Sequence, residues 1–392
     1  MVSRAGGRVS RDPTITMTRL DWVSDITHIG RGAWDDVTSS AGLFFRYEWI
    51  EGNQRALPCE PLFLKLSRDN RLVGVTPFLI VDASAYPFFV PSKLLVEVLG
   101  RASAPELATR IHETLPPSAL VAAVPFGYAS PLSCTPVEFL RSVAESARLK
   151  SEELGLSCAA FLYLGEADQR AIKVLEDAGY LSTPLETTWI LDILPEWSDF
   201  EGFCRTQRHG KMMRYEHRTF QRRGFMVAWH DRLTDELLRT IAYLEHMHLL
   251  RHGHSDTLEN LFRWYEDLRQ LMPADLLVVT AADHRGVIKG FVLFLRSGAD
   301  IIAKTVGIAD DVARKDFLYF SISVYEPVRY AIKHGIRAIE LGPAAAASKR
   351  ARGAEATRLF GTFSFRGDSA VARYWPSVAL ALRSYVDRSD SR

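Results

Sequence analysis

The chain has 392 residues, a formal net charge of +1 and a hydrophobic residue content of 47%. A chain of this length exceeds what one hydrophobic core usually supports, so two domains are expected. The near-neutral charge excludes a uniformly basic nucleic-acid-binding protein, although it leaves room for a local basic patch.

Residues 1–15 contain Gly-Arg clusters and Pro13, and they are predicted to form a flexible tail. They lack the apolar stretch of a secretory signal, and no apolar run in the chain reaches the roughly 18 residues of a membrane span. The four cysteines lie far apart without a CxxC pair. This spacing argues against a zinc site or a disulfide framework and favours a cytoplasmic location.

Residues 16–180 are predicted to form the first domain, in which helical and strand-like patterns alternate. Such alternation is typical of an α/β fold. The predicted helices cover residues 21–39, 106–115, 136–154 and 168–178. The predicted strands cover residues 61–66, 72–81, 119–125 and 158–164.

Residues 181–392 are predicted to form the second domain, with a cleft for donor and acceptor. The predicted helices cover residues 199–223, 235–251, 257–271 and 314–334, with a short one near Glu355. The predicted strands cover residues 183–193, 276–282, 287–295, 301–307, 338–341 and 360–366.

An internal similarity links the two domains. Residues 62–81 and 276–295 both read as an apolar strand, an Asp-x-Arg turn and a second strand that carries a glycine, Gly74 or Gly290. Their separation of about two hundred residues is one domain length, so the pattern favours a duplicated α/β domain. An unrelated pair of β-hairpins is the simpler alternative.

The order hairpin, strand and long helix in the second domain resembles the centre of a GNAT acyltransferase domain. In most of that superfamily a glycine-rich loop opens the helix, because backbone N–H groups must approach the phosphates of acetyl-CoA. Here no glycine occurs between Gly307 and Gly335. The usual coenzyme A cradle is therefore missing from the sequence.

Residues 317–353 resemble the peptidoglycan biosynthesis or recognition family, which comprises GNAT-like relatives of the Fem transferases. The matching residues are Tyr330, Ala331, Ile332, His334 and Gly335, followed by Gly342, Lys349, Arg352 and Gly353. The basic segment 204–224 also resembles the family, and the similarity runs from about residue 30 to 367. Two departures are the alanines at 344–347 and Glu326, which stands where the family has glutamine.

This resemblance implies two tandem GNAT-like domains with mixed sheets flanked by helices. It also implies transfer of an aminoacyl group from aminoacyl-tRNA to an amine or hydroxylamine of a small molecule or peptide, in antibiotic or cell-wall precursor biosynthesis. No cofactor is then needed, since the tRNA ester is already reactive. The alternatives are an acyl-CoA-dependent N-acetyltransferase, with acetyl-CoA as donor, and a non-catalytic module that binds cell-wall or nucleotide ligands.

A basic stripe is predicted on the helix at residues 199–223. It consists of five cations that recur every three or four residues and share one helix face, namely Arg208, Lys211, Arg214, Arg218 and Arg222. Such a face suits an RNA phosphate backbone. A solvated helix face is the alternative. The residues assigned to tRNA are Arg205, Arg208, Lys211, Arg214, Arg218 and Arg222, together with Lys349 and Arg352 beyond the Gly-Pro-Ala segment.

A group of histidines follows residue 243. His248 and His252, together with Tyr243, are candidates for the lining of the acceptor pocket, and surface or packing roles are the alternative. His246 and His254 lie in the same stretch. Few carboxylates and no cysteine accompany them, so no metal site is predicted.

Three residues are candidates for catalysis. Lys304 lies in an apolar strand, where a lysine is costly unless it faces a cleft or finds a partner; it is a candidate for stabilising an oxyanion, with an edge-strand position as the alternative. Glu326 and Tyr319 are seven residues apart and are expected to share a helix face. Glu326 is a candidate general base for the incoming amine, with an exposed helix position as the alternative.

Overall fold

The computed structural model describes residues 18–253, 256–343, 345–367 and 369–391. The predicted flexible tail at residues 1–15 therefore lies outside the described residues, as does His254. Among the described residues, no helix combines the length and apolarity that a membrane crossing requires.

The first half of the chain supplies five strands and six helices among the described residues. The strands are β1 (Thr18–Val23), β2 (Glu60–Arg68), β3 (Arg71–Val81), β4 (Ala119–Ala122) and β5 (Cys158–Leu164). The helices are α1 (Arg31–Thr38), α2 (Tyr47–Ala56), α3 (Pro91–Arg101), α4 (Pro105–Thr114), α5 (Leu140–Glu153) and α6 (Gln169–Asp177).

The rest of the chain supplies seven more strands. They are β6 (Leu181–Asp192), β7 (Met226–His230), β8 (Leu276–Ala282), β9 (Ile288–Ser297), β10 (Asp300–Ile308), β11 (Ala338–Gly342) and β12 (Glu355–Phe365). The helices are α7 (Phe200–Thr206), α8 (Gly210–Arg222), α9 (Asp235–Arg251), α10 (Leu258–Leu271), α11 (Leu318–Phe320), α12 (Glu326–His334), α13 (Ala346–Arg350) and α14 (Ala370–Ser391). A π-helical turn, Ser321–Tyr325, separates α11 from α12.

All twelve strands belong to one mixed sheet, in the order β1-β2-β3-β4-β5-β12-β6-β11-β10-β9-β8-β7. Each half runs antiparallel until one parallel pair, β4 with β5 and β10 with β11. The two halves thus repeat one strand pattern, which confirms an α/β fold built from two tandem units with mixed strand pairing.

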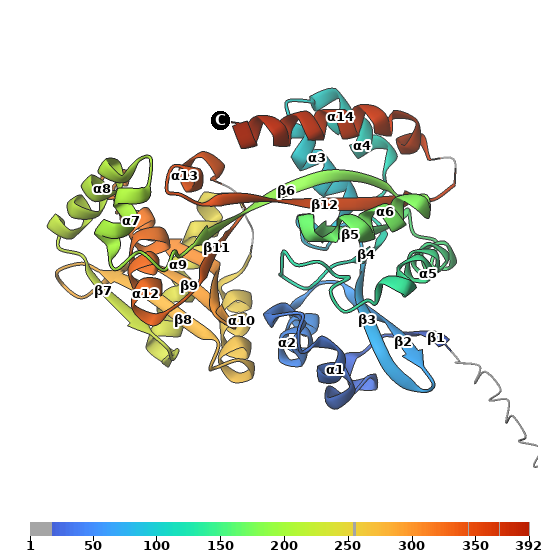
Figure 1. Ribbon diagram of the computed structural model, residues 1–392, viewed down its shortest axis with the longest axis horizontal. Helices are drawn as coiled ribbons and strands as arrows, with labels where there is room; N and C mark the ends of the chain where they lie inside the picture. Colours follow the sequence, from blue (N-terminus) through green and yellow to red (C-terminus); the bar gives the residue numbers. More distant parts are fainter. Residues whose placement is uncertain (1–17, 254–255, 344, 368, 392) are drawn as a thin grey trace, which may run out of the picture.

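Strands β6 and β12 each pair with a strand of the other half. β6 follows the first half but pairs with β11, and β12 ends the second half but pairs with β5. β6 and β12 also pair with each other and form the long bridge across the molecule in Figure 1. α14 then packs against α3, α4 and β6. The domain boundary after residue 180 stays a prediction, with β6 beginning at that point.

The two similar segments form matching hairpins, β2–β3 and β8–β9. The glycine of each hairpin allows a later segment of the chain to pack closely against the strand that carries it. A Cβ on Gly74 would lie 2.6 Å from Pro136, and one on Gly290 would lie 2.5 Å from Leu318. Both contacts are too short for a side chain, so each glycine lets a following segment pack directly on its hairpin.

Four predicted elements differ from the structure. Residues 18–23 form strand β1 rather than the start of a helix, because they pair with β2. The helix predicted at 199–223 breaks between α7 and α8, and the helix predicted at 314–334 contains the π turn. Residue 355 begins β12 rather than a helix, because it pairs with β6. Backbone pairing with distant strands outweighed local helix propensity in both strand cases.

One hydrophobic core joins the two halves. It brings Trp34 and Trp49 of α1 and α2 together with Leu238 of α9, Tyr265 of α10 and Leu293 of β9. All five side chains are buried. The packing of α2 against α10 fixes the position of one half against the other, and the space beside this core is the site described next.

Candidate active site between the two halves

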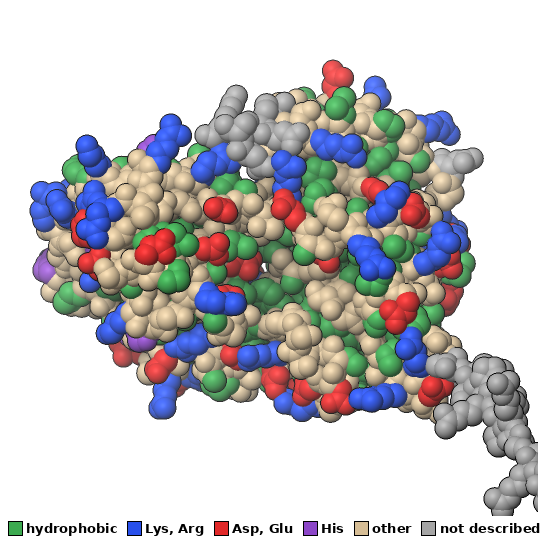
Figure 2. All heavy atoms as spheres, viewed as in Figure 1, with side chains coloured by type: hydrophobic (Ala, Val, Ile, Leu, Met, Phe, Trp, Pro, Cys, Tyr) green, Lys and Arg blue, Asp and Glu red, His purple; other side chains and the backbone are tan. Residues whose placement is uncertain are grey.

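A cavity of about 1080 Å³ lies between the two halves and takes lining side chains from both. The first half contributes mainly aromatic rings, and the second contributes most of the charged groups. In Figure 2 hydrophobic side chains are visible in the hollow between the halves. Its volume lies at the upper end of the range that small-molecule sites occupy.

Lys304 lies on β10 inside this cavity. The strand is flanked by β9 and β11, so the edge-strand alternative is wrong. An irregularity in the β9–β10 register falls between Ala303 and Thr305. The ammonium group donates a hydrogen bond of 2.6 Å to the backbone carbonyl of Phe126 and lies 5.5 Å from the centre of that ring. Burial lowers the pKa of Lys304 to about 8.

Glu245 is a site residue that the sequence analysis missed. It lies on α9 and is buried, and its carboxylate accepts a hydrogen bond of 2.5 Å from the hydroxyl of Tyr265. The Tyr265 oxygen also lies 2.7 Å from the hydroxyl of Thr305, next to Lys304. Burial raises the pKa of Glu245 to about 7, against the opposing effects of the Tyr265 hydrogen bond and the Lys304 charge.

Gly307 brings Glu245 to the strand that carries Lys304. A Cβ at this position would lie 2.7 Å from the backbone carbon of Leu244 and 2.8 Å from the nitrogen of Glu245. Only a glycine therefore allows α9 to rest directly on β10. The helical spacing of Leu238, Ile241 and Glu245 places the carboxylate on the buried face of α9, and this is the sequence signal that identifies it.

Glu340 on β11 is a second carboxylate in the cavity that the sequence analysis missed. Burial raises its pKa, while a hydrogen bond of 3.4 Å from the hydroxyl of Thr188 and the charges of Lys304 and Lys349 oppose the shift. Two carboxylates with raised pKa values thus face a lysine with a lowered one. Such shifts are typical of groups that exchange protons at neutral pH.

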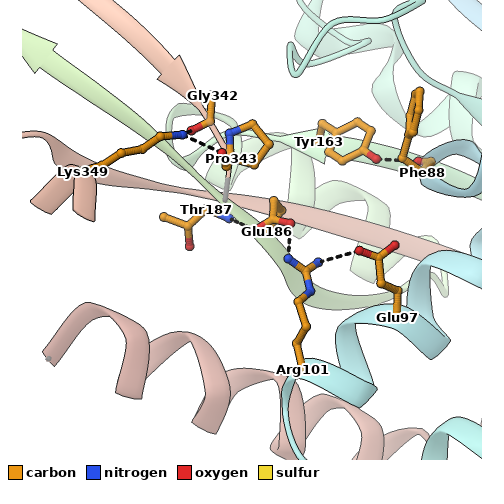
Figure 3. Close-up of polar contacts among 9 residues, drawn as sticks. All are labelled: Phe88, Glu97, Arg101, Tyr163, Glu186, Thr187, Gly342, Pro343 and Lys349. Carbon is orange, nitrogen blue, oxygen red and sulfur yellow. Dashed lines mark hydrogen bonds and ion pairs between the residues drawn. The ribbon is translucent and has the colours of Figure 1, made fainter. Parts of the chain in front are cut away.

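Lys349 also lines the cavity, but its ammonium group is committed to the backbone. It donates hydrogen bonds to the carbonyls of Leu341 (2.6 Å), Gly342 (2.9 Å) and Pro343 (2.6 Å). Figure 3 shows Lys349 beside Gly342 and Pro343. Burial lowers its pKa to about 8. Lys349 therefore does not lie in a solvated loop, and the three bonds use the three N–H protons that a donor phosphate would need.

Arg352 also lines the cavity, where it belongs to a buried polar cluster. It forms an ion pair of 2.6 Å with Glu216 and donates hydrogen bonds to the Tyr325 hydroxyl and the Ser348 carbonyl. Its guanidinium stacks on the ring of Phe320 at 3.3 Å. Arg352 is 4% exposed, so it does not belong to an open basic loop.

Figure 3 shows how the first half supports this side of the cavity. Glu186 on β6 accepts a hydrogen bond of 2.7 Å from Arg101 and one of 3.1 Å from the backbone of Thr187. Tyr163 on β5 donates a hydrogen bond of 2.5 Å to the carbonyl of Phe88. The first contact ties α3 to β6, and the Tyr163 hydrogen bond ties β5 to the turn at Pro87–Phe89.

Tyr319 lines the cavity, whereas Glu326 does not, so their expected shared face is wrong. The cause is the π turn between them, which adds residues per turn and rotates α12 relative to α11. Glu326 is buried, which also overturns its exposed alternative. Its carboxylate lies 3.0 Å from Arg329 and 3.6 Å from His217, away from the reacting groups.

His248 and His252 line the cavity with ring centres 4.7 Å apart, and their role in binding an acceptor stays a prediction. Tyr243 lies on the outer face of α9 and is 54% exposed, because it is two residues from the buried Glu245. Among the described residues, no three His, Cys, Asp or Glu side chains are grouped as metal ligands.

Four of the stripe cations share a surface hollow beside α7 and α8. They are Lys211, Arg214, Arg218 and Arg222, joined by Glu201 and Tyr215. Figure 2 shows Lys and Arg side chains gathered over these helices. Arg208, the fifth cation of the stripe, precedes α8 and does not share its helix face. Arg205, which was also assigned to tRNA, lies in α7. Glu201 lies 2.5 Å from Arg214 and 3.8 Å from Arg218, so an acid supplied by α7 partly neutralises the stripe.

Comparison with known proteins supports this architecture. Residues 119–391 match the FemAB-like family, described as peptidoglycan biosynthesis/recognition. The crystal structure of FemX is similar with a TM-score of 0.57 and 12% identity, covering 91% of this chain and 100% of that one. A conserved protein of unknown function from Bacteroides thetaiotaomicron is similar with a TM-score of 0.50 and 9% identity, covering 88% and 100%. No curated protein sequence matches the chain.

Proposed function

We propose that this chain, which belongs to the FemAB-like family of peptidoglycan biosynthesis and recognition proteins, is an aminoacyltransferase whose reaction takes place in the cavity between its halves. The observation that carries the proposal is that Glu245 and Lys304 line the same cavity, where Tyr265 joins Glu245 to Thr305, the neighbour of Lys304. Burial moves the pKa of the acid up to about 7 and that of the base down to about 8. Each group is then poised to exchange or hold a proton near neutral pH.

The proposed step is attack of an amine nitrogen on an ester carbonyl. An N–C bond forms and the ester C–O bond breaks. The amine proton passes to the Glu245 carboxylate, which then delivers it to the leaving ribose oxygen. The Lys304 ammonium stabilises the oxyanion that develops on the carbonyl oxygen. No oxidant or reductant is needed, because the donor is already activated.

An aminoacyl-tRNA is the proposed donor. The hollow beside α8 supports this choice, because Lys211, Arg218 and Arg222 present cations at the surface of the protein. The absence of glycine between Gly307 and Gly335 argues against acetyl-CoA, which we expect to bind no tighter than the high-micromolar range. Tyr319, His248 and His252 are proposed to line the acceptor side.

The test is a transfer assay with radiolabelled aminoacyl-tRNAs, and with acyl-CoA in parallel, against a panel of small amines. We expect transfer from one or more aminoacyl-tRNAs that falls at least about a hundredfold in Glu245→Gln. Glu236→Gln is the matched control, because Glu236 lies exposed on the same helix. Transfer from acyl-CoA alone would contradict the donor proposal. Saturable glycan binding without transfer from either donor would contradict the enzyme proposal.

A further inference from the structure

The part of the cavity next to Lys304 has an aromatic wall. It consists of Tyr86, Phe88, Phe126, Tyr128 and Tyr163 from the first half and Trp264 from α10. The rings contact one another: Tyr86 stacks on Phe88 with ring centres 5.5 Å apart, and Tyr128 meets Tyr163 edge-on at 4.9 Å. Phe126 also contacts Tyr86, Phe88 and Trp264, so four of the rings form one connected apolar surface, and the Tyr128–Tyr163 pair adds to the lining of the same cavity.

Two of these rings are held at a cost in backbone energy. Phe126 has a φ of 49° and Tyr163 a φ of 62°, both in the left-handed region that bulky residues avoid. Backbone strain of this kind persists where the surroundings impose it, and it concentrates at binding and catalytic sites. The strain here directs two aromatic residues to the same cavity, so the wall is a built feature of the site.

The wall carries little charge. Among the described lining residues of the first half, Arg55 is the one cation, and it lies 2.9 Å from Glu51. On α10, Arg263 lies 3.0 Å from Glu259, and the acids Asp256 and Asp267 share the same rim. A nucleotide diphosphate carries at least two negative charges and needs unpaired cations. This side of the cavity instead suits an uncharged apolar group.

The aromatic wall begins next to Lys304. Phe126 accepts the hydrogen bond of Lys304 through its carbonyl and presents its ring 5.5 Å from the same ammonium. A substrate whose nitrogen lies between Glu245 and Lys304 therefore has the group next to that nitrogen directly against the aromatic surface.

We propose that the acceptor is a primary amine that carries an aromatic or aliphatic group next to the nitrogen, rather than a nucleotide-linked precursor. The apolar group packs on the aromatic wall and excludes water from the nitrogen, which keeps the amine in its reactive uncharged form. This inference rests on the acyl transfer proposed above, because it names the substrate of the same site.

The test is calorimetric binding to the full chain without donor, using 2-phenylethylamine, ethylamine and UDP-N-acetylglucosamine as probes. We expect 2-phenylethylamine to bind at least about tenfold more tightly than ethylamine, and the nucleotide sugar to bind more weakly than 2-phenylethylamine. Phe88→Ala should weaken 2-phenylethylamine about tenfold, whereas Phe88→Leu should keep most of the affinity because it keeps most of the apolar surface. Leu380→Ala, on the exposed face of α14, is the control and should change nothing.

Equal affinity for ethylamine and 2-phenylethylamine would overturn the proposal, and so would tighter binding of the nucleotide sugar. The comparison of the three probes on the unaltered protein holds even where Phe88→Ala fails to fold. Tight binding of 2-phenylethylamine without any acyl transfer would refute the transferase proposal alone. Transfer that proceeds only to nucleotide-linked amines would refute the aromatic-wall proposal alone.

Discussion

The two halves of the molecule repeat one scaffold and differ in the chemistry that they place on it. In each half the parallel strand pair follows the hairpin, but β4 is wholly apolar and buried, whereas its counterpart β10 carries Lys304. Likewise β5 presents Tyr163, whereas its counterpart β11 presents Glu340. The first half therefore lines the cavity mainly with aromatic rings, and the second lines it with most of the titratable groups. A repeated fold does not imply a repeated site.

The charged half also contains two lysines in different roles. Both are buried with pKa values lowered to about 8. Lys349 gives its hydrogen bonds to three carbonyls at the end of β11, whereas Lys304 gives one to Phe126 and faces the cavity. Burial alone thus does not distinguish the two lysines. The number of backbone partners does, and it is the reason that Lys304 is proposed as the catalytic one.

The largest effect is expected from Lys304→Met. Loss of the charge at the developing oxyanion should lower the rate of transfer by about a hundredfold to a thousandfold. Stability should hold or rise, because the buried charge costs free energy. Single-turnover transfer measures the rate, and Lys333→Met, on the exposed side of α12, serves as the control. An unchanged rate would show that Lys304 does not act in transfer, so that its presence on β10 and not on β4 would have no functional meaning.

Lys349→Met should show the opposite pattern. It leaves three carbonyls without their donor, so the free energy of unfolding should fall by on the order of 3 kcal/mol. Urea unfolding of both methionine variants measures the difference. A Lys349→Met protein that keeps its stability but loses transfer would show that this ammonium acts in the cavity after all.

The smallest effect on the folded protein is expected from the double change Arg214→Ala and Arg218→Ala. If α8 contacts RNA phosphates, the salt dependence of tRNA binding should lose about two units of slope. Stability should change by less than about 1 kcal/mol, because Arg218 is exposed and Arg214 pairs with an acid that is half exposed. Filter binding across a salt series measures the slope. An unaltered slope would show that Arg214 and Arg218 do not contact tRNA and that this face of α8 is simply solvated.

Much of the scaffold was predictable from the sequence, since the hairpins at residues 62–81 and 276–295 carry their own strand and turn signals. Strands β1 and β12 were less accessible, because partners far along the chain stabilise them. The π turn was missed for a similar reason. All five of its side chains are buried, and tertiary packing rather than local propensity holds such a turn.

The candidate site was predictable in part. Lys304 stands out because a lysine in an apolar strand demands an explanation, and His248 and His252 also face the cavity. Glu245 was missed because it lies among the apolar residues of the buried face of α9, and such a face is typical of core packing. Glu326 was favoured because regular helical spacing was assumed across a segment that does not keep it.

The pairing of Glu245 with Lys304 is tested most directly by the pH dependence of transfer. Glu245 must be deprotonated to accept a proton, so the rate should rise as pH passes about 7. Lys304 must stay protonated, so the rate should fall as pH passes about 8. The acceptor should be a weakly basic amine such as methoxyamine, which is neutral across this range. Glu245→Gln should abolish the rising limb and leave a low rate, whereas a Glu245→Gln profile with the same limb and the same rate as the unaltered protein would contradict the account.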